Sequence, residues 1–358
     1  MCRMTTALPG LALVLMALHL CAAPDALAQP SRTTASVEAI ALYQGQDREQ
    51  RLLEGAKKEG GLILYGSMTG PDQEVLLEAF TKRYGIKVQS WRGGSEAVLQ
   101  RTVAESRAGR FGADIVDNNV AEMEALRRET LLQKVESPQH ANLISAAVPA
   151  HKEWIGDSID MFVQAYNTDK IKPADLPKTY HDLLDPKWKG QLGVEATDQH
   201  WFATVLEQLG YDEGMALFKR IVDTSGISVR RGHNLLANMV ASGEVPLALT
   251  VYGHSPAEIK KKGGPIEQFV IPPPIGAFRS IGLLKSAPHP HAALLYYDFL
   301  LGPDGQQILL NRARVPTSKD LNSPWKNVAI KFIDPVRALD MNAKWTRDYE
   351  TAVTKRMK

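Results

Sequence analysis

The sequence contains little cysteine, and the position of its two cysteines limits what the protein can do. Cys2 and Cys21 both lie within residues 1–28, which have the layout of a secretory signal peptide. This segment carries an early positive charge, an apolar run from Leu11 to Ala23, and an Ala26-Leu27-Ala28 cleavage site. We expect its removal to leave a chain without cysteine, which excludes disulfides and thiol catalysis.

The sequence also lacks a long hydrophobic run and a strong excess of one charge. The apolar run of the leader is shorter than the about 20 residues that span a bilayer, so an uncleaved anchor is only the alternative to cleavage. A lipid anchor is not expected, because the bulky Leu20 precedes Cys21.

The formal net charge is +2 without a basic stripe, which argues against a nucleic-acid partner. About 330 residues would remain, enough for two domains. We therefore expect an exported, periplasmic protein.

Strand-like and helix-like segments alternate along the rest of the chain. A predicted helix over Asp47–Lys58 is followed by a short apolar strand over Leu62–Tyr65 and by a helix that begins at Pro71. The alternation resumes after Asp160–Tyr166, a long apolar strand. These patterns predict an α/β fold with mixed, mostly parallel sheets that helices cover on both faces. The proline-rich segment Phe269–Pro274 cannot lie centrally in a sheet, and we interpret it as the crossing back from the second block.

Four stretches of the sequence point to one family. They are Leu62–Ser67, Asp182–Gly190, Ala241–Ala248, and the run that begins at Gly282 and continues through Ala287–Pro290 to Gln306. Together they resemble the type 2 periplasmic solute-binding proteins of ABC importers, in the branch that includes ferric-iron-binding proteins. The resemblance extends from about Leu62 to Thr317.

This resemblance implies a two-lobed fold with two crossing hinge strands, in which a small solute binds between the lobes. The closed form would deliver the solute to an ABC permease at the inner membrane, with a sensory receptor as the alternative partner. The implied domains are a signal peptide (1–28), a flexible lead-in (29–45), a discontinuous first lobe (46–165 plus 275–358) and a second lobe (166–274). The expected protein is a monomeric receptor without a cofactor, and not an enzyme.

Candidate ligand-binding residues follow from the place where α/β sheets bind ligands. Loops at the carboxyl ends of strands meet the N-termini of the following helices, whose free N–H groups favour anions. The Gly93-Gly94-Ser95 turn is the strongest candidate, and Arg230–Asn234 offers a cationic helix start. Helix caps and solvated surface arginines are the structural alternatives. The predicted ligand-binding residues are Ser67, Met68, Thr69, Arg92, Gly94, Ser95, Asp117, Asp198, Gln199, Arg231, His233, Asn234, Tyr252 and Arg279.

The tyrosine pattern bears on the choice between an organic anion and iron. The ferric-iron-binding proteins that the sequence resembles show two consecutive tyrosines, whereas this chain has Val251-Tyr252-Gly253. The pair Tyr296-Tyr297 lies in a predicted amphipathic helix, and we interpret it as packing and surface. We therefore expect a solute with a carboxylate, phosphonate or phosphate group held by arginine side chains, and no metal site. Fe(III) as the transported ligand, with Tyr252 as a metal ligand, is the alternative.

Overall fold

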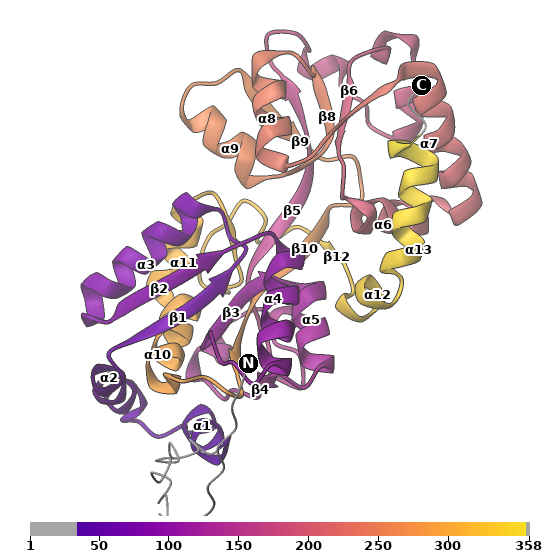
Figure 1. Cartoon of the computed structure of the whole chain (residues 1–358). Coiled ribbons are helices and arrows are strands. Elements are labelled where there is room, and N and C mark those ends of the chain that lie inside the picture. Colours follow the sequence, from indigo (N-terminus) through magenta and orange to yellow (C-terminus); the bar gives the residue numbers. More distant parts are fainter. Residues whose placement is uncertain (1–33, 356–358) are drawn as a thin grey trace, which may run out of the picture. The chain divides into compact units, whose positions relative to one another are not determined.

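The computed structural model describes residues 34–355, so the predicted signal peptide lies outside the described residues. The described strands form one mixed sheet that helices flank (Figure 1). Along its main path the strands follow the order β2-β1-β3-β10-β5-β8-β6-β7. Within this part of the chain, no helix combines the length and the apolar character that crossing a membrane requires.

Parallel pairing joins the strands that alternate with helices, since β1 pairs with β2 and β3, and β6 pairs with β7 and β8. The strands of the main path are β1 (Gly61–Gly66), β2 (Lys87–Arg92), β3 (Ile115–Asn119), β5 (Ile155–Asn167), β6 (Leu192–Glu195), β7 (Ile227–Arg230), β8 (Leu247–Tyr252) and β10 (Ile275–Leu284). Short strands at its margins are β4 (Leu132–Gln133), β9 (Ile266–Phe269), β11 (Val315–Pro316) and β12 (Lys331–Phe332).

Helices connect most of these strands, as the alternating pattern predicts. They are α1 (Thr34–Ala41), α2 (Arg48–Glu59), α3 (Gly70–Tyr84), α4 (Ser95–Arg107), α5 (Val120–Arg128), α6 (Gln199–Leu209), α7 (Tyr211–Ser225), α8 (His233–Ser242), α9 (His254–Lys261), α10 (Pro290–Leu301), α11 (Pro303–Asn311), α12 (Pro335–Asp340) and α13 (Asn342–Tyr349). A π-helical turn, Glu350–Thr354, continues α13. Five short 3-10 helices lie at Pro138–Asn142, Ser145–Ala147, Pro173–Asp175, Tyr180–Leu184 and Pro186–Trp188.

Two long strands, β5 and β10, cross between the two parts of the sheet (Figure 1). All 13 residues of β5 are buried. The first half of β5 pairs antiparallel with β10, and its second half pairs antiparallel with β8 and β9. The return crossing expected at Phe269–Pro274 is made instead by β10, which begins just after the prolines. The prolines have no N–H groups to donate to a ladder, so the crossing strand starts beyond them.

The C-terminal helices pack against the second block of elements. Trp345 and Tyr349 of α13 share a buried apolar cluster with Trp201 of α6. The Tyr349 hydroxyl donates a 2.6 Å hydrogen bond to the backbone oxygen of Glu195. The predicted lobe boundaries stay a prediction, but these contacts associate α13 with residues 166–274, whereas the sequence analysis assigned it to the first lobe.

The lead-in expected to be flexible contains a helix, α1. Val37 and Ala41 stand one helical turn apart, and both are buried in a cluster that includes residues of α10. Most positions of α1 are apolar (TASVEAIA), so its sequence shows little of the apolar–polar contrast that reveals a helix by periodicity. Tertiary burial against α10 therefore stabilises a helix that the local sequence does not announce.

We predict that Tyr349→Ala lowers the free energy of unfolding by about 3–5 kcal/mol, the usual cost of truncating a large buried aromatic side chain. Tyr349→Phe removes only the hydroxyl and should cost about 1 kcal/mol. Urea unfolding followed by circular dichroism measures both. Val336→Ala, at a position that is 43% exposed on α12, is the control. A Tyr349→Ala variant as stable as this control would show that the C-terminal helix does not contribute to the folded core.

Candidate functional site

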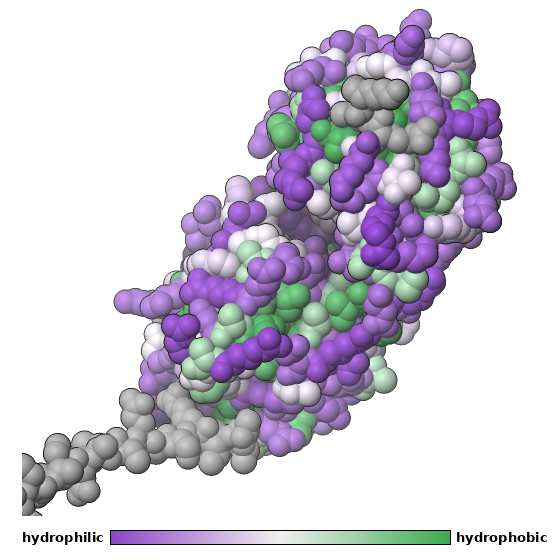
Figure 2. Space-filling model, turned by 45° about the vertical axis from the view of Figure 1, so that its right-hand side comes forward, coloured by the Kyte–Doolittle hydropathy of each residue, from purple (hydrophilic) through white to green (hydrophobic). Residues whose placement is uncertain are grey.

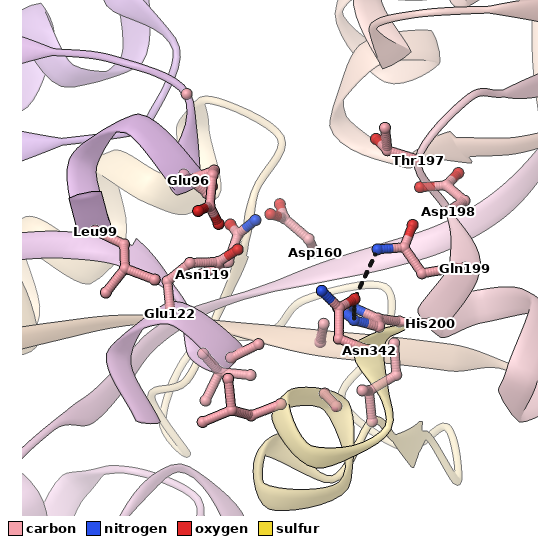
Figure 3. A pocket seen from close by; sticks show the side chains of 18 of the residues that line it. Glu96, Leu99, Asn119, Glu122, Asp160, Thr197, Asp198, Gln199, His200 and Asn342 are labelled. Atoms are coloured by element: carbon pink, nitrogen blue, oxygen red, sulfur yellow. Dashed lines mark hydrogen bonds between the residues drawn. The ribbon is translucent and has the colours of Figure 1, made fainter. Parts of the chain in front are cut away.

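A cavity of about 650 Å³ opens where four helices begin. Its wall includes the first turns of α4, α5, α6 and α8, which follow the carboxyl ends of β2, β3, β6 and β7. The crossing strands contribute Asp160 and Phe162 from β5, and Ala277 and Phe278 from β10. Figure 3 shows side chains of α4 and α5 on one side and those of α6 on the other. The face in Figure 2 is largely hydrophilic and is hollowed near its middle. Sequence analysis expected the ligand site at such strand ends.

The structure divides the predicted ligand-binding residues into three sets. Residues that line the cavity are Gly94, Ser95, Asp198, Gln199, Arg231, His233 and Tyr252. Thr69 and Asn234 line a separate cavity of about 250 Å³. Residues that line neither are Ser67, Met68, Arg92, Asp117 and Arg279. The binding role of each residue stays a prediction, and the cavity supports it for the first set.

Arg279 is engaged inside the protein. It is 4% exposed and forms an ion pair with Asp117, and it also donates to Asn119 Oδ1 (3.1 Å) and Ser67 Oγ (3.2 Å). Asp157 lies nearby, and burial raises the pKa of its carboxyl to about 8, with the Asp117 charge as the second cause. Arg279 therefore ties β10 to β3 and is not available as a free cation for a solute.

Two other arginines that the sequence analysis assigned to an oxyanion also have partners within the chain. Arg92 Nε donates a 2.7 Å hydrogen bond to the backbone oxygen of Met68. Arg230 Nη1 donates to the backbone oxygen of Val229, and its Nη2 lies 3.8 Å from a Glu244 oxygen. Among the predicted arginines, Arg231 alone lines the cavity, and its side chain is exposed there. Sequence could not separate these cases, because Met68 and Glu244 lie in other segments of the chain.

Most of the acidic residues of the cavity are not among the predicted ligand-binding residues. Its wall holds Glu96, Glu122 and Asp160 in addition to the predicted Asp198. Glu96 and Glu122 stand in the first turns of α4 and α5, so the rule that selected Ser95 could also have selected them. Other lining residues had no such signal, such as Asn342 of α13, which accepts a 3.0 Å hydrogen bond from Gln199 (Figure 3).

Burial changes the protonation of two of these acids. It raises the pKa of Glu122 to about 7, and Glu122 Oε2 has no hydrogen-bond partner among residues 34–355. It raises the pKa of Asp198 to about 6, although His233 and the Thr250 hydroxyl lower it, and Asp198 Oδ2 also lacks a hydrogen-bond partner within the described chain. The other Asp198 oxygen lies 3.4 Å from His233 Nε2. Asp160 differs from both, because Arg314 Nη1 lies 3.1 Å from its carboxylate.

One cluster among the described residues has the composition of a metal site. Ligand atoms of Glu195, Asp198 and His233 lie within 4.8 Å of one another. However, Glu195 Oε1 accepts a 2.9 Å hydrogen bond from the Gly232 N–H, and Oε2 accepts a 2.7 Å bond from the Thr197 hydroxyl. Glu195 thus fastens the loops before α6 and α8 with both of its oxygens, whereas Asp198 Oδ2 and His233 Nδ1 have no partner within residues 34–355.

Three tyrosines bear on the choice between an organic anion and iron. Tyr252 lines the cavity and stacks on His233, with 3.6 Å between the ring centroids. Burial raises the pKa of Tyr252 well above its usual value. Tyr296 and Tyr297 are fully buried in the helix α10, which agrees with packing. The expected surface position and amphipathic helix are wrong, because nearly every residue of α10 is buried.

The fold and this cavity define a solute-binding protein of the type that serves ABC importers. The chain belongs to the family of bacterial extracellular solute-binding proteins, whose profile matches residues 113–334. Members of this class are transport receptors and not enzymes, and they carry their ligand as cargo and not as a cofactor.

Several characterised proteins are similar to the chain. It is 26% identical over 307 residues to the Fe(3+)-binding periplasmic protein of Serratia marcescens, covering 81% of this chain and 89% of that one. The structure of iron-bound HitA from Pseudomonas aeruginosa has a TM-score of 0.70 at 24% identity, covering 80% and 98% of the two chains. The structure of AfuA from Actinobacillus pleuropneumoniae, with fructose-6-phosphate bound, has a TM-score of 0.71 at 21% identity, covering 82% and 99%. The two structures confirm the predicted fold class.

We predict that Arg279→Met lowers the free energy of unfolding by about 3–5 kcal/mol, because the Asp117 charge would stay buried without its partner. The double variant Arg279→Met with Asp117→Leu removes both charges and should recover part of this loss. Urea unfolding of the three proteins provides the comparison. If Arg279→Met kept full stability but lost solute binding, Arg279 would belong to the ligand site after all.

We also predict a pH dependence that originates from Glu122. The pKa of Glu122 is about 7 in the folded protein, against an ordinary value of 4.5. Its contribution to the free energy of unfolding is therefore complete below about pH 4.5 and is lost as the pH rises through 7. Between about pH 4.5 and 8 this group should remove about 3 kcal/mol of stability, and Glu122→Gln should abolish that decline. Urea unfolding at several pH values measures it, with the exposed Glu78→Gln as control. Parallel pH profiles of wild type and Glu122→Gln would contradict the prediction.

Proposed function

We propose that this protein captures a small organic solute with an oxyanion group and delivers it to an ABC permease. The observation that carries this proposal is the convergence of four helix N-termini on one cavity. Each N-terminus presents free N–H groups and a partial positive charge, which favour an anion. The cavity volume of about 650 Å³ suits a molecule of drug or sugar-phosphate size.

The oxyanion is best accommodated at the starts of α6 and α8. Arg231 lines the cavity there, and its guanidinium can form two parallel hydrogen bonds with a carboxylate or phosphate. His200 and His233 line the same wall. AfuA, which shares the fold, has been solved with fructose-6-phosphate bound, and this supports a phosphate ester as one suitable class of solute.

Delivery follows from two conformations with different affinity for the solute. Contacts from both walls of the cavity favour the form in which the walls are close together, and a permease would recognise that form. The family and the predicted signal peptide support a periplasmic location. We expect a monomer, and a sensory receptor is the alternative recipient of the closed form.

Iron is the second candidate cargo. The name of the Serratia marcescens relative favours it, and Tyr252 places one phenol at the cavity next to Asp198. Burial raises the pKa of Tyr252, so its phenolate would form only with a metal bound. With one tyrosine at this cavity, we rank Fe(III) below an organic oxyanion.

A thermal-shift screen with and without Fe(III) distinguishes the two cargoes. The probes are carboxylates, phosphonates and sugar phosphates, and a ligand at 100 times its Kd adds about 2.7 kcal/mol of stability. Stabilisation by an organic anion alone supports the proposal. Stabilisation that requires Fe(III), together with a visible tyrosinate charge-transfer band, would replace it with iron transport.

We predict that Arg231→Ala weakens the binding of fructose 6-phosphate by about 10- to 100-fold, the effect of losing a charge-assisted hydrogen bond of about 1.5–3 kcal/mol. Because Arg231 is exposed, the melting temperature should not change. Isothermal titration calorimetry measures the affinity. Arg220→Ala, at an exposed arginine of α7 away from the cavity, is the matched control. Equal affinities of both variants would remove Arg231 from the site.

A further inference from the structure

The two walls of the cavity differ in charge. The wall formed by α4 and α5 holds Glu96 and Glu122 and, among its lining residues, no cationic side chain. The opposite wall holds Arg231 and, beside Asp198, His233 and His200; burial lowers the pKa of His200 and favours its neutral form. An oxyanion could pair with Arg231 on the second wall, and it would leave the acids of the first wall and Asp198 without a partner.

Glu96 and Glu122 stand close enough to influence each other. The Glu96 charge adds to burial in raising the pKa of Glu122. Glu96 is exposed, and its Oε1 accepts a 2.7 Å hydrogen bond from Gln100 Nε2. Figure 3 shows Glu96, Asn119 and Glu122 next to one another at the cavity. A cationic group placed there would relieve the repulsion between the two acids.

Buried oxygens without partners indicate that the solute supplies hydrogen-bond donors. Glu122 Oε2 on one wall and Asp198 Oδ2 on the other have no partner among the described residues. Asp198 is 4% exposed, so water reaches it poorly. A buried polar atom left without a hydrogen bond is costly, and an oxyanion has acceptors only. A hydroxyl group of the solute is a sufficient hydrogen-bond donor for Asp198. A cationic group is not needed there, because His233 and Arg231 lie on the same wall.

A metal ion fits the wall formed by α4 and α5 less well than a cationic group of the solute does. The metal-type cluster found among residues 34–355 comprises Glu195, Asp198 and His233, and it excludes both Glu96 and Glu122. The two glutamates therefore form no chelating set of three ligands with each other and Asp160. An ammonium group needs only separate acceptors around it and no set of three ligand atoms at chelating distance.

We propose that the solute carries a protonated amine as well as its oxyanion, and that Glu96 and Glu122 receive the amine at the starts of α4 and α5. This inference rests on the proposed oxyanion function, which places the other end of the solute beside Arg231. The solute class is thus an amino-phosphate, amino-phosphonate or amino acid-like molecule that spans the cavity.

Matched probes that differ by the amine test this inference. Isothermal titration calorimetry of the full protein would compare glucosamine 6-phosphate with glucose 6-phosphate, and O-phosphoethanolamine with ethyl phosphate. We expect the amine-bearing member of at least one pair to bind about tenfold more tightly or better. Glu122→Gln and Glu96→Gln should each reduce this preference, while the amine-free member binds as before or more tightly. The exposed Glu78→Gln should keep the wild-type preference.

The outcomes separate this inference from the proposed function. Equal affinity for both members of each pair would overturn the amine assignment and leave the oxyanion function in place. If glucosamine or ethanolamine bound as tightly as its phosphate, the amine site at Glu96 and Glu122 would be supported and the oxyanion function would be overturned. Binding of none of these probes, with a response to Fe(III) alone, would overturn both. Circular dichroism and urea unfolding of the two glutamate variants show whether a lost preference reflects a lost fold.

Discussion

The antiparallel pairing of β5 with β10 is the interaction on which the rest of the structure depends. β5 is buried along its whole length, and its two halves pair with different partners, so it belongs to both parts of the sheet. The buried ion pair between Arg279 of β10 and Asp117 of β3 fastens the first part to this pair of strands. A buried charge is tolerable only with its partner, which makes the arrangement specific to this register.

The cavity follows from that arrangement. The crossing strands bring the carboxyl ends of β2 and β3 to face those of β6 and β7, and the helices that follow these strands all begin at the same space. The backbone thus supplies positive potential from several directions before any side chain is considered. The side chains then decide which solute fits, and here they are unequal on the two walls.

Proteins with this fold differ in cargo because cargo depends on few positions. The similar structures include one with iron bound and one with fructose-6-phosphate bound, at nearly the same TM-score. In this chain a single tyrosine lines the cavity, where Glu96, Glu122 and Asp198 also lie. These acids face a space that no basic side chain of α4 or α5 lines. The charge of the solute, and not the fold, should therefore decide which solute the protein binds.

The sequence by itself determined the elements and the places where binding is possible. Periodicity located α2, β1 and α3 within a few residues, and the strand-end rule found Ser95, Gln199 and His233 at the cavity. Only the tertiary structure decided which charged groups remain available. Arg279 pairs with Asp117, 162 residues away, and the C-terminal Asn342 reaches the cavity through α13. Local patterns specify helices and strands because neighbouring residues set them, whereas the partner of a charge depends on which distant segments the fold brings together.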